Sequence, residues 1–385
     1  MSFDKDEKAP WKIGVLFSQT GVTAVAERPQ LNATLLAIDQ INGAGGVAGR
    51  PLEPVVYDPA SDPKSFRYHA ERLLGEDGVT IIAGCYMSST RKAVVPVAEQ
   101  YRGLLLYPTL YEGFEYSDHC LYTGAAPNQN IVQLATYLLE HFGDRVYLVG
   151  SNYVYPYETN RIMSDLFHSA HGDVVDERYV PLNVTAEACA QIAQDIKRKQ
   201  PDVVFSTIVG SATSTLYRAY HAAGLDPRKI PIASLTTTES EVQEIGAEAA
   251  EGHITAAPYF QTVDSPENRA FLAAYNARFG DDVAATSGAE AAYFQMYLIA
   301  EALERAGTDR IEDVLANVYK AEFAAPQGTV RVDPENNHTY LWPRVGRVNA
   351  QGQFELVWES GAWVKPDPYL VATAVGEWGA HVAKA

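Results

Sequence analysis

The chain has 385 residues, enough for two domains, and its 47% hydrophobic and 20% charged residues are typical of a globular protein. A net charge of −18 disfavours direct binding to nucleic acid and to anionic membranes, and no apolar stretch approaches the about 20 residues that cross a bilayer. The three cysteines, Cys85, Cys120 and Cys189, are too few and too widely spaced for a disulfide framework or a CxxC site.

The first eight residues, MSFDKDEK, are charged and carry neither the apolar segment nor the small-residue cleavage site of an export signal. An initiating methionine directly before such a segment predicts a cytoplasmic protein. A periplasmic location is the alternative, if a signal has been removed.

Short apolar runs alternate with helical periodicities along the chain. Lys12–Ser18 is predicted as a strand, and apolar residues at 31, 35, 38 and 41 predict a helix that ends at Asn42-Gly43. Gly43-x-Gly45-x-x-Ala48 closes this helix and enters a strand, the reverse of a dinucleotide-binding fingerprint, and is interpreted as a turn. Because strands and helices keep alternating, the sequence predicts an α/β fold with parallel sheets. Further strands are predicted at Leu52–Tyr57, Val79–Ala83, Leu104–Leu106, Arg145–Gly150, Val174–Pro181, Asp202–Ile208 and Ile230–Leu235.

Two consecutive series of these units predict two Rossmann-like lobes rather than one large sheet. A strand within Gly252–Pro258 is expected to return to the first lobe, and the end of the chain is expected to form a hairpin from Thr329–Val332, Val345–Val348 and Phe354–Trp358. Two lobes joined by several crossings make a hinged cleft that can close around a ligand. The lobes are expected to comprise residues 1–124 with about 253–328, and about 125–252 with about 329–385.

The sequence contains none of the common catalytic or phosphate-binding motifs HExxH, GxSxG and GxxxxGK(S/T). His168 and His171 share a helix without carboxylate or thiol partners for a metal, and Glu112 and Glu115 lie in a loop, where carboxylates are usually solvated. Cys85 lies beside the proposed cleft, but no basic partner that would activate its thiol can be placed. We therefore expect neither an enzyme nor a bound metal or cofactor.

Aromatic and hydroxyl side chains follow several of the predicted strands. Because ligands of open α/β sheets bind beyond the carboxyl ends of the strands, these side chains are expected to converge on one cleft. Neutral hydroxyl donors and tyrosine walls suit a small uncharged molecule such as an amide or urea. An amino acid would also need a carboxylate for its ammonium group; Glu290 is the one candidate, and its helix position favours a structural role. The predicted ligand-binding residues are Tyr86, Ser88, Tyr107, Pro108, Thr109, Tyr153, Tyr155, Val209 and Thr236.

Two segments that contain predicted site residues, Gly84–Val94 (GCYMSSTRKAV) and Tyr107–Ser117 (YPTLYEGFEYS), resemble the amide sensors of the AmiC type. The resemblance continues over nearly the whole chain. It implies a type I periplasmic-binding-protein fold that serves as a cytoplasmic sensor and holds an AmiR-like RNA-binding antiterminator inactive until a short amide binds. Tyr157 departs from that family, which has an arginine there, and the sequence leaves a homo-oligomer open.

The chain is also similar to the urea- or short-amide-binding receptors of ABC transporters, for which the partner would be an ABC permease. The motifs shared with those receptors include Gly124–Gln129 (GAAPNQ), Asp264–Asn268 (DSPEN) and Lys365–Tyr369 (KPDPY). The missing export signal and the form of the two tyrosine motifs favour the sensor, whereas a gene start further upstream with an export signal would favour the receptor.

Overall fold

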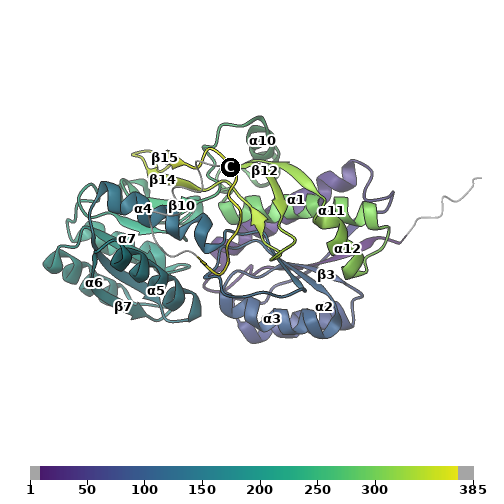
Figure 1. Cartoon of the computed structure of the whole chain (residues 1–385), viewed down its shortest axis with the longest axis horizontal. Helices are drawn as coiled ribbons and strands as arrows, with labels where there is room; N and C mark the ends of the chain where they lie inside the picture. Colours follow the sequence, from purple (N-terminus) through teal and green to yellow (C-terminus); the bar gives the residue numbers. More distant parts are fainter. Residues whose placement is uncertain (1–8, 372–385) are drawn as a thin grey trace, which may run out of the picture.

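The computed structural model describes residues 9–371, which form two lobes side by side (Figure 1). Each lobe has a central sheet with helices against it. The charged start at residues 1–8 and the end of the predicted second lobe at residues 372–385 lie outside the described part of the chain.

The sheet of the first lobe is parallel throughout, with the strand order β2-β1-β3-β4-β5. Two of its strands, Ile81–Gly84 and Leu104–Tyr107, are buried at every position, as expected for short apolar strands that are covered on both faces. The strands are β1 (Trp11–Leu16), β2 (Leu52–Tyr57), β3 (Ile81–Gly84), β4 (Leu104–Tyr107) and β5 (Cys120–Tyr122).

Helices from both ends of the chain cover this first sheet. α1 packs along α11, so a segment near the start and one near residue 300 share a core. α2 and α3 pack together over a second, separate apolar cluster. The helices of this lobe are α1 (Ala24–Gly43), α2 (Pro63–Gly75), α3 (Ser88–Tyr101), α10 (Pro266–Phe279), α11 (Ser287–Ala306) and α12 (Ile311–Val318).

The second lobe is built on a mixed sheet with the order β15-β14-β10-β9-β8-β6-β7. Its strands are β6 (Arg145–Ser151), β7 (Asp173–Val180), β8 (Val203–Thr207), β9 (Ile232–Ser234), β10 (Ile254–Ala257), β14 (Arg344–Val348) and β15 (Phe354–Glu359). Its helices are η1 (Pro127–Gln129), α4 (Ile131–His141), α5 (Val154–Ser169), α6 (Ala186–Lys199), α7 (Ala212–Ala222), α8 (Glu239–Ile245) and α9 (Ala247–Ala250).

The chain crosses between the lobes at places that differ from the expected boundaries. β10 pairs in parallel with β9 and antiparallel with β14, so the chain returns to the first lobe after Pro258 and not at 253. The predicted pairing of β14 with β15 is confirmed. Residues 329–332 do not belong to that hairpin: they pair within a small sheet whose Val330 and Val332 enter the core of the first lobe. This sheet contains β11 (Glu322–Ala325), β12 (Gly328–Val332) and β13 (Thr339–Tyr340).

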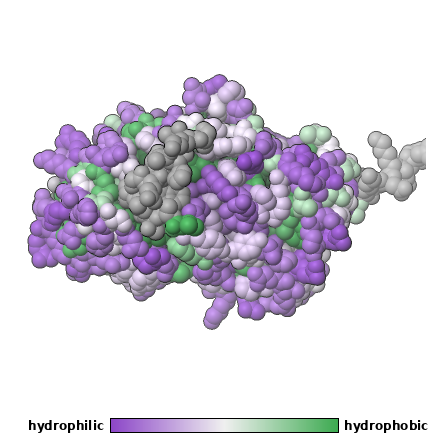
Figure 2. All heavy atoms as spheres, in the orientation of Figure 1, coloured by the Kyte–Doolittle hydropathy of each residue, from purple (hydrophilic) through white to green (hydrophobic). Residues whose placement is uncertain are grey.

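The face of the molecule in Figure 2 is largely hydrophilic, with apolar residues scattered in small groups. Within residues 9–371, no helix combines the length and the apolar character that crossing a membrane requires.

Candidate ligand-binding site

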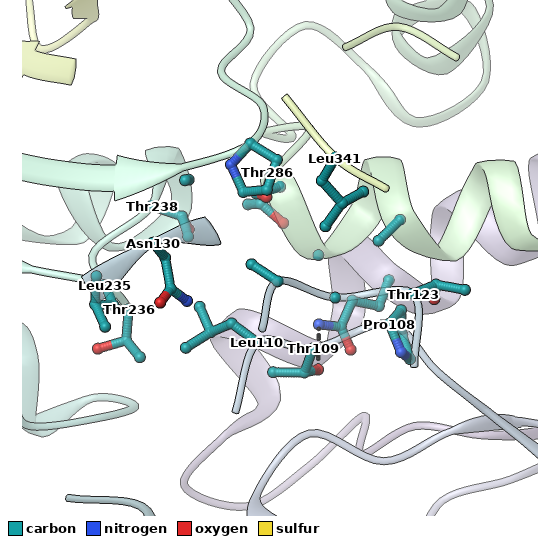
Figure 3. Close-up of a pocket in the computed structure, with 18 of the residues that line it drawn as sticks. Pro108, Thr109, Leu110, Thr123, Asn130, Leu235, Thr236, Thr238, Thr286 and Leu341 are labelled. Carbon is teal, nitrogen blue, oxygen red and sulfur yellow. Dashed lines mark hydrogen bonds between the residues drawn. The ribbon is translucent and has the colours of Figure 1, made fainter. Parts of the chain in front are cut away.

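A cavity lies between the lobes at the carboxyl ends of the strands of both sheets. The segments after β3, β4 and β5 contribute one wall and those after β9 and β10 the other, while the first turn of α11 closes it (Figure 3). This is where the topology of open α/β sheets places a ligand. The lining residues are Ala26, Gln30, Tyr86, Pro108, Thr109, Leu110, Thr123, Gly124, Ala125, Asn130, Leu235, Thr236, Thr238, Ala256, Ala257, Pro258, Thr286, Ser287, Gly288, Ala291, Gln327 and Leu341.

The cavity is small and its lining carries no charged side chain. Its volume is about 40 Å³. A ligand that fits must therefore be compact and has no countercharge to meet at the wall.

The structure brings four of the predicted site residues to this cavity, namely Tyr86, Pro108, Thr109 and Thr236. Burial raises the pKa of the Tyr86 phenol, which keeps the phenol a neutral hydrogen-bond donor. The Thr236 hydroxyl donates to the carbonyl oxygen of Ile208 within its own lobe (3.2 Å). That these residues bind a ligand stays a prediction.

Thr109 is held at the cavity by its backbone and by its hydroxyl. A Cβ on Gly124 would lie 2.1 Å from the carbonyl carbon of Thr109, so only glycine permits this close approach. The Thr109 hydroxyl donates to the carbonyl oxygen of Cys85 (3.4 Å) and accepts from Gln30 Nε2 (3.2 Å). The Cys85 thiol itself is buried, and desolvation raises its pKa, so it is no thiolate nucleophile.

Two further lining residues, Gln30 and Asn130, were not among the predicted site residues. Each side chain is 2% exposed, yet Gln30 Oε1 and Asn130 Nδ2 have no hydrogen-bond partner. Gln30 lies within α1, where sequence offers no signal beyond a polar residue on a buried helix face. Asn130 follows η1 directly and comes immediately after the shared motif Gly124–Gln129, which contains none of the predicted site residues.

The other predicted residues lie around the cavity but are not among its lining residues: Ser88, Tyr107, Tyr153, Tyr155 and Val209. The Tyr107 hydroxyl donates to the carbonyl oxygen of Tyr86 (2.6 Å) and so supports a lining residue from behind. Tyr153 packs against Tyr86 and Met87, and its ring centroid lies 6.2 Å from that of Tyr155. The Val209 N–H donates to Ser151 Oγ (3.3 Å).

Ser88 belongs to a buried charged group that we name the Arg91 cluster: Ser88, Arg91, Lys92, Glu112 and Glu115. Arg91 is fully buried and pairs with Glu112 (3.2 Å) and Glu115 (2.7 Å), while Ser88 donates to Glu112 and accepts from Arg91. Burial alone would raise the pKa of Glu115, but Arg91 and Lys92 outweigh it and lower the pKa to about 2. Ion pairing thus explains Glu112 and Glu115 without an acid–base role.

Glu290, the one candidate partner for an ammonium group, is buried beside the cavity and is not part of its lining. Its carboxyl accepts from the backbone N–H of Gln327 (3.2 Å) and from Gln327 Nε2 (2.7 Å), and burial raises its pKa to about 8. Glu290 therefore orients the lining residue Gln327 and presents no anion to the ligand.

The lobes contact each other outside the cavity lining. The N–H of Ser211 in the second lobe donates to the carbonyl oxygen of Val22 in the first (3.3 Å). Tyr157, which departs from the amide sensors, is 43% exposed and contacts Tyr179 on the surface of the second lobe. Tyr157 is not among the residues that line the cavity.

Within residues 9–371, no three His, Cys, Asp or Glu side chains gather in a way that could hold a metal ion. His168 lies on α5 with Nδ1 near Ser164 Oγ (3.3 Å), and both residues are at the surface of the helix. What the site offers a ligand is therefore hydrogen bonding and an apolar wall.

Sequence and structure comparisons identify the family. A model of the periplasmic binding protein domain matches residues 11–374, so the chain belongs to this family and has the predicted two-lobed type I architecture. A Leu/Ile/Val-binding protein homolog of Brucella abortus is 26% identical over 302 residues, 76% of this chain and 77% of that protein. A Geobacillus stearothermophilus protein named limonene hydroxylase is 30% identical over 131 residues, but the chain spans only 24% of that relative's length.

The fold also matches a solved structure closely. The solute binding protein of an ABC transporter from Rhodopseudomonas palustris HaA2, in complex with p-hydroxybenzoic acid, superposes with a TM-score of 0.83. The match covers 95% of this chain and 100% of that one at 24% sequence identity. At this identity the similarity concerns the fold alone.

Proposed function

We propose that this protein is a solute-binding receptor that encloses one small uncharged molecule of the amide or urea class and delivers it to an ABC permease. The observation that carries this proposal is the interlobe cavity, which combines a volume of about 40 Å³ with a lining free of charged side chains. A receptor for amino acids or aromatic acids would need a countercharge or more room. The Rhodopseudomonas palustris protein with the matching fold is the solute binding protein of an ABC transporter, which supports transport as the role.

A second candidate role is a sensor that releases an AmiR-like antiterminator when an amide binds. The motifs at Gly84–Val94 and Tyr107–Ser117 support it, because their residues hold Tyr86 and Thr109 at the cavity. Both roles use the same ligand chemistry, since either needs only a ligand that binds the closed arrangement better than the open one.

Titration calorimetry on the purified protein tests the ligand class. We expect micromolar binding of acetamide or urea and no detectable binding of leucine or p-hydroxybenzoate. Tight binding of leucine with acetamide inert would overturn the proposal. The roles then separate in cells: deletion of the gene should abolish uptake of the labelled amide for a receptor, and should make amidase expression independent of amides for a sensor.

A further inference from the structure

A chain of hydrogen bonds fixes the orientation of the side-chain amide of Gln30, which is one of the residues that line the cavity. The carbonyl oxygen of Cys85 can only accept, so the Thr109 hydroxyl must give its proton to it (3.4 Å). Thr109 Oγ1 is then left as an acceptor for Gln30 Nε2 (3.2 Å), which is the dashed line in Figure 3. The Gln30 amide is thereby oriented, and its buried, unpartnered Oε1 is an acceptor.

The orientation of the Asn130 amide is fixed by a neighbouring donor, whereas that of Gln30 is fixed by a neighbouring acceptor. The backbone N–H of Ile131, at the start of α4, can only donate, and it donates to Asn130 Oδ1. The oxygen of the Asn130 amide is therefore occupied, and the buried Nδ2 without a partner is a donor. Asn130 and Thr109 lie on different sides of the cavity (Figure 3).

We propose that Asn130 Nδ2 and Gln30 Oε1 are the specificity-determining pair of this cavity, which selects a ligand that carries both a carbonyl oxygen and an N–H group. This inference rests on the proposed function and deepens it. Asn130 donates to the carbonyl oxygen of the ligand, and Gln30 accepts from its N–H. The two side chains lie nine-tenths or more buried, so water cannot replace either bond when the ligand fails to make it.

The pair explains how an uncharged site can reject molecules of the same size. Acetate matches acetamide in shape but sets a carboxylate oxygen against Gln30 Oε1, acceptor to acceptor. Acetone satisfies Asn130 and leaves Gln30 Oε1 unpaired. A site built around a hydrogen bond discriminates strongly against a ligand that lacks the matching group, because its own buried polar atom then stays unpaired.

Calorimetry with acetamide, urea, acetone and acetate tests this on the whole protein, since the four probes have equal numbers of non-hydrogen atoms. We expect acetamide and urea to bind at least about tenfold more tightly than acetone, and acetate to bind most weakly. This ranking needs no variant. Equal affinity for acetone and acetamide, or a preference for acetate, would overturn the pair while leaving an uncharged-ligand or small-ligand receptor intact.

Two substitutions test which atom of each side chain binds the ligand. Gln30→Met removes the acceptor and should lower acetamide affinity about tenfold while leaving acetone binding unchanged. Asn130→Asp keeps the oxygen that caps α4 but exchanges the donor for an acceptor, so it should weaken acetamide and acetone alike. Unchanged acetamide affinity in either variant would contradict the assignment.

Matched controls come from outside the cavity. Asn160 is also buried with an unpartnered Nδ2, and its Oδ1 accepts from Thr207 (2.9 Å), but it is not a lining residue. Asn160→Asp makes the same chemical exchange and should leave acetamide affinity within about twofold; Gln133→Met on α4 serves in the same way for Gln30. If the wild-type protein binds none of the four probes, the proposed function itself fails, which is distinguishable from a failure of the pair.

Discussion

Two groups of buried polar side chains, one in the first lobe and one in the lining of the cavity between the lobes, differ in how their hydrogen bonds are satisfied. The Arg91 cluster is charged, and its arginine bonds to two carboxylates and a hydroxyl. The cavity lining is uncharged, and it leaves Gln30 Oε1 and Asn130 Nδ2 without partners. Buried polar groups are nearly always paired in folded proteins. The first group follows this rule within the fold, whereas the cavity lining retains a donor and an acceptor that the proposed ligand would satisfy.

The comparison separates residues that look alike in the sequence. Ser88 and Thr109 both bear hydroxyls just beyond a central strand of the first sheet, and both were assigned to the site. The Ser88 hydroxyl is used by Glu112 and Arg91, whereas Thr109 orients a cavity residue. A hydroxyl at a strand end therefore indicates a binding site only when a hydrogen-bond donor or acceptor next to it remains available to a ligand.

Removing the arginine should give the largest effect of any single change. Arg91→Met leaves the buried carboxylates Glu112 and Glu115 without their main partner, and should lower the free energy of unfolding by about 3–5 kcal/mol. Thermal denaturation measures this. The control is Arg67→Met, whose pair with Glu71 is exposed and should matter by less than about 0.5 kcal/mol. Equal losses in the two variants would show that the cluster is not a structural anchor.

The acid limb of the stability curve tests the same cluster more finely. Despite the cost of burial, ion pairing lowers the pKa of Glu115 from 4.5 to about 2. The carboxylate therefore stabilises the fold above about pH 4.5, and this contribution disappears as the pH falls toward 2. Glu115→Gln should cost about 1–3 kcal/mol at pH 7 and almost nothing near pH 2.

Denaturation series from pH 7 down to pH 2 give this difference directly. Glu71→Gln, on an exposed helix surface, is the control and should cost less than about 0.5 kcal/mol at pH 7. A deficit in Glu115→Gln that stayed constant with pH would mean that the lost energy is packing and not charge.

Local sequence patterns predict much of the fold, but they do not predict the boundaries between the lobes. The strand predicted at Val79–Ala83 corresponds to β3, and the alternation of strands and helices is enough to predict parallel sheets. The lobe to which β10 belongs depends on its pairing with β14, about 90 residues further along the chain. The sequence around Ile254–Ala257 does not indicate that β14 will pair with this strand. The return of the chain to the first lobe is therefore predicted too early.

The residues of the cavity likewise include some that the sequence predicts and some that it does not. Tyr86, Thr109 and Thr236 follow strand ends, so topology alone predicts that they face one cleft. Gln30 comes from a helix, and whether a helical residue is covered, paired or left facing a cavity depends on what packs against it. Its role became visible only with the hydrogen bond to Thr109.

On the cavity side, the expected effects are smaller and appear in binding. Thr109→Val keeps the shape of the side chain but removes the oxygen that accepts from Gln30 Nε2. The Gln30 amide is then free to turn, and acetamide affinity should fall about 5- to 30-fold, or about 1–2 kcal/mol. Thr136→Val on α4, where the hydroxyl bonds only to the Val132 carbonyl, is the matched control and should bind acetamide like the wild type. Equal affinities in all three proteins would remove Thr109 from the site.

Ser88→Ala should have the smallest effect on binding, and it decides between the two groups. It removes a donor to Glu112 and an acceptor for Arg91, so unfolding should become easier by about 1 kcal/mol. Acetamide affinity should stay within about twofold, because Ser88 is not among the lining residues. A tenfold loss of affinity with unchanged stability would instead place Ser88 at the ligand, and the distinction between paired and unpaired polar side chains would not mark the site.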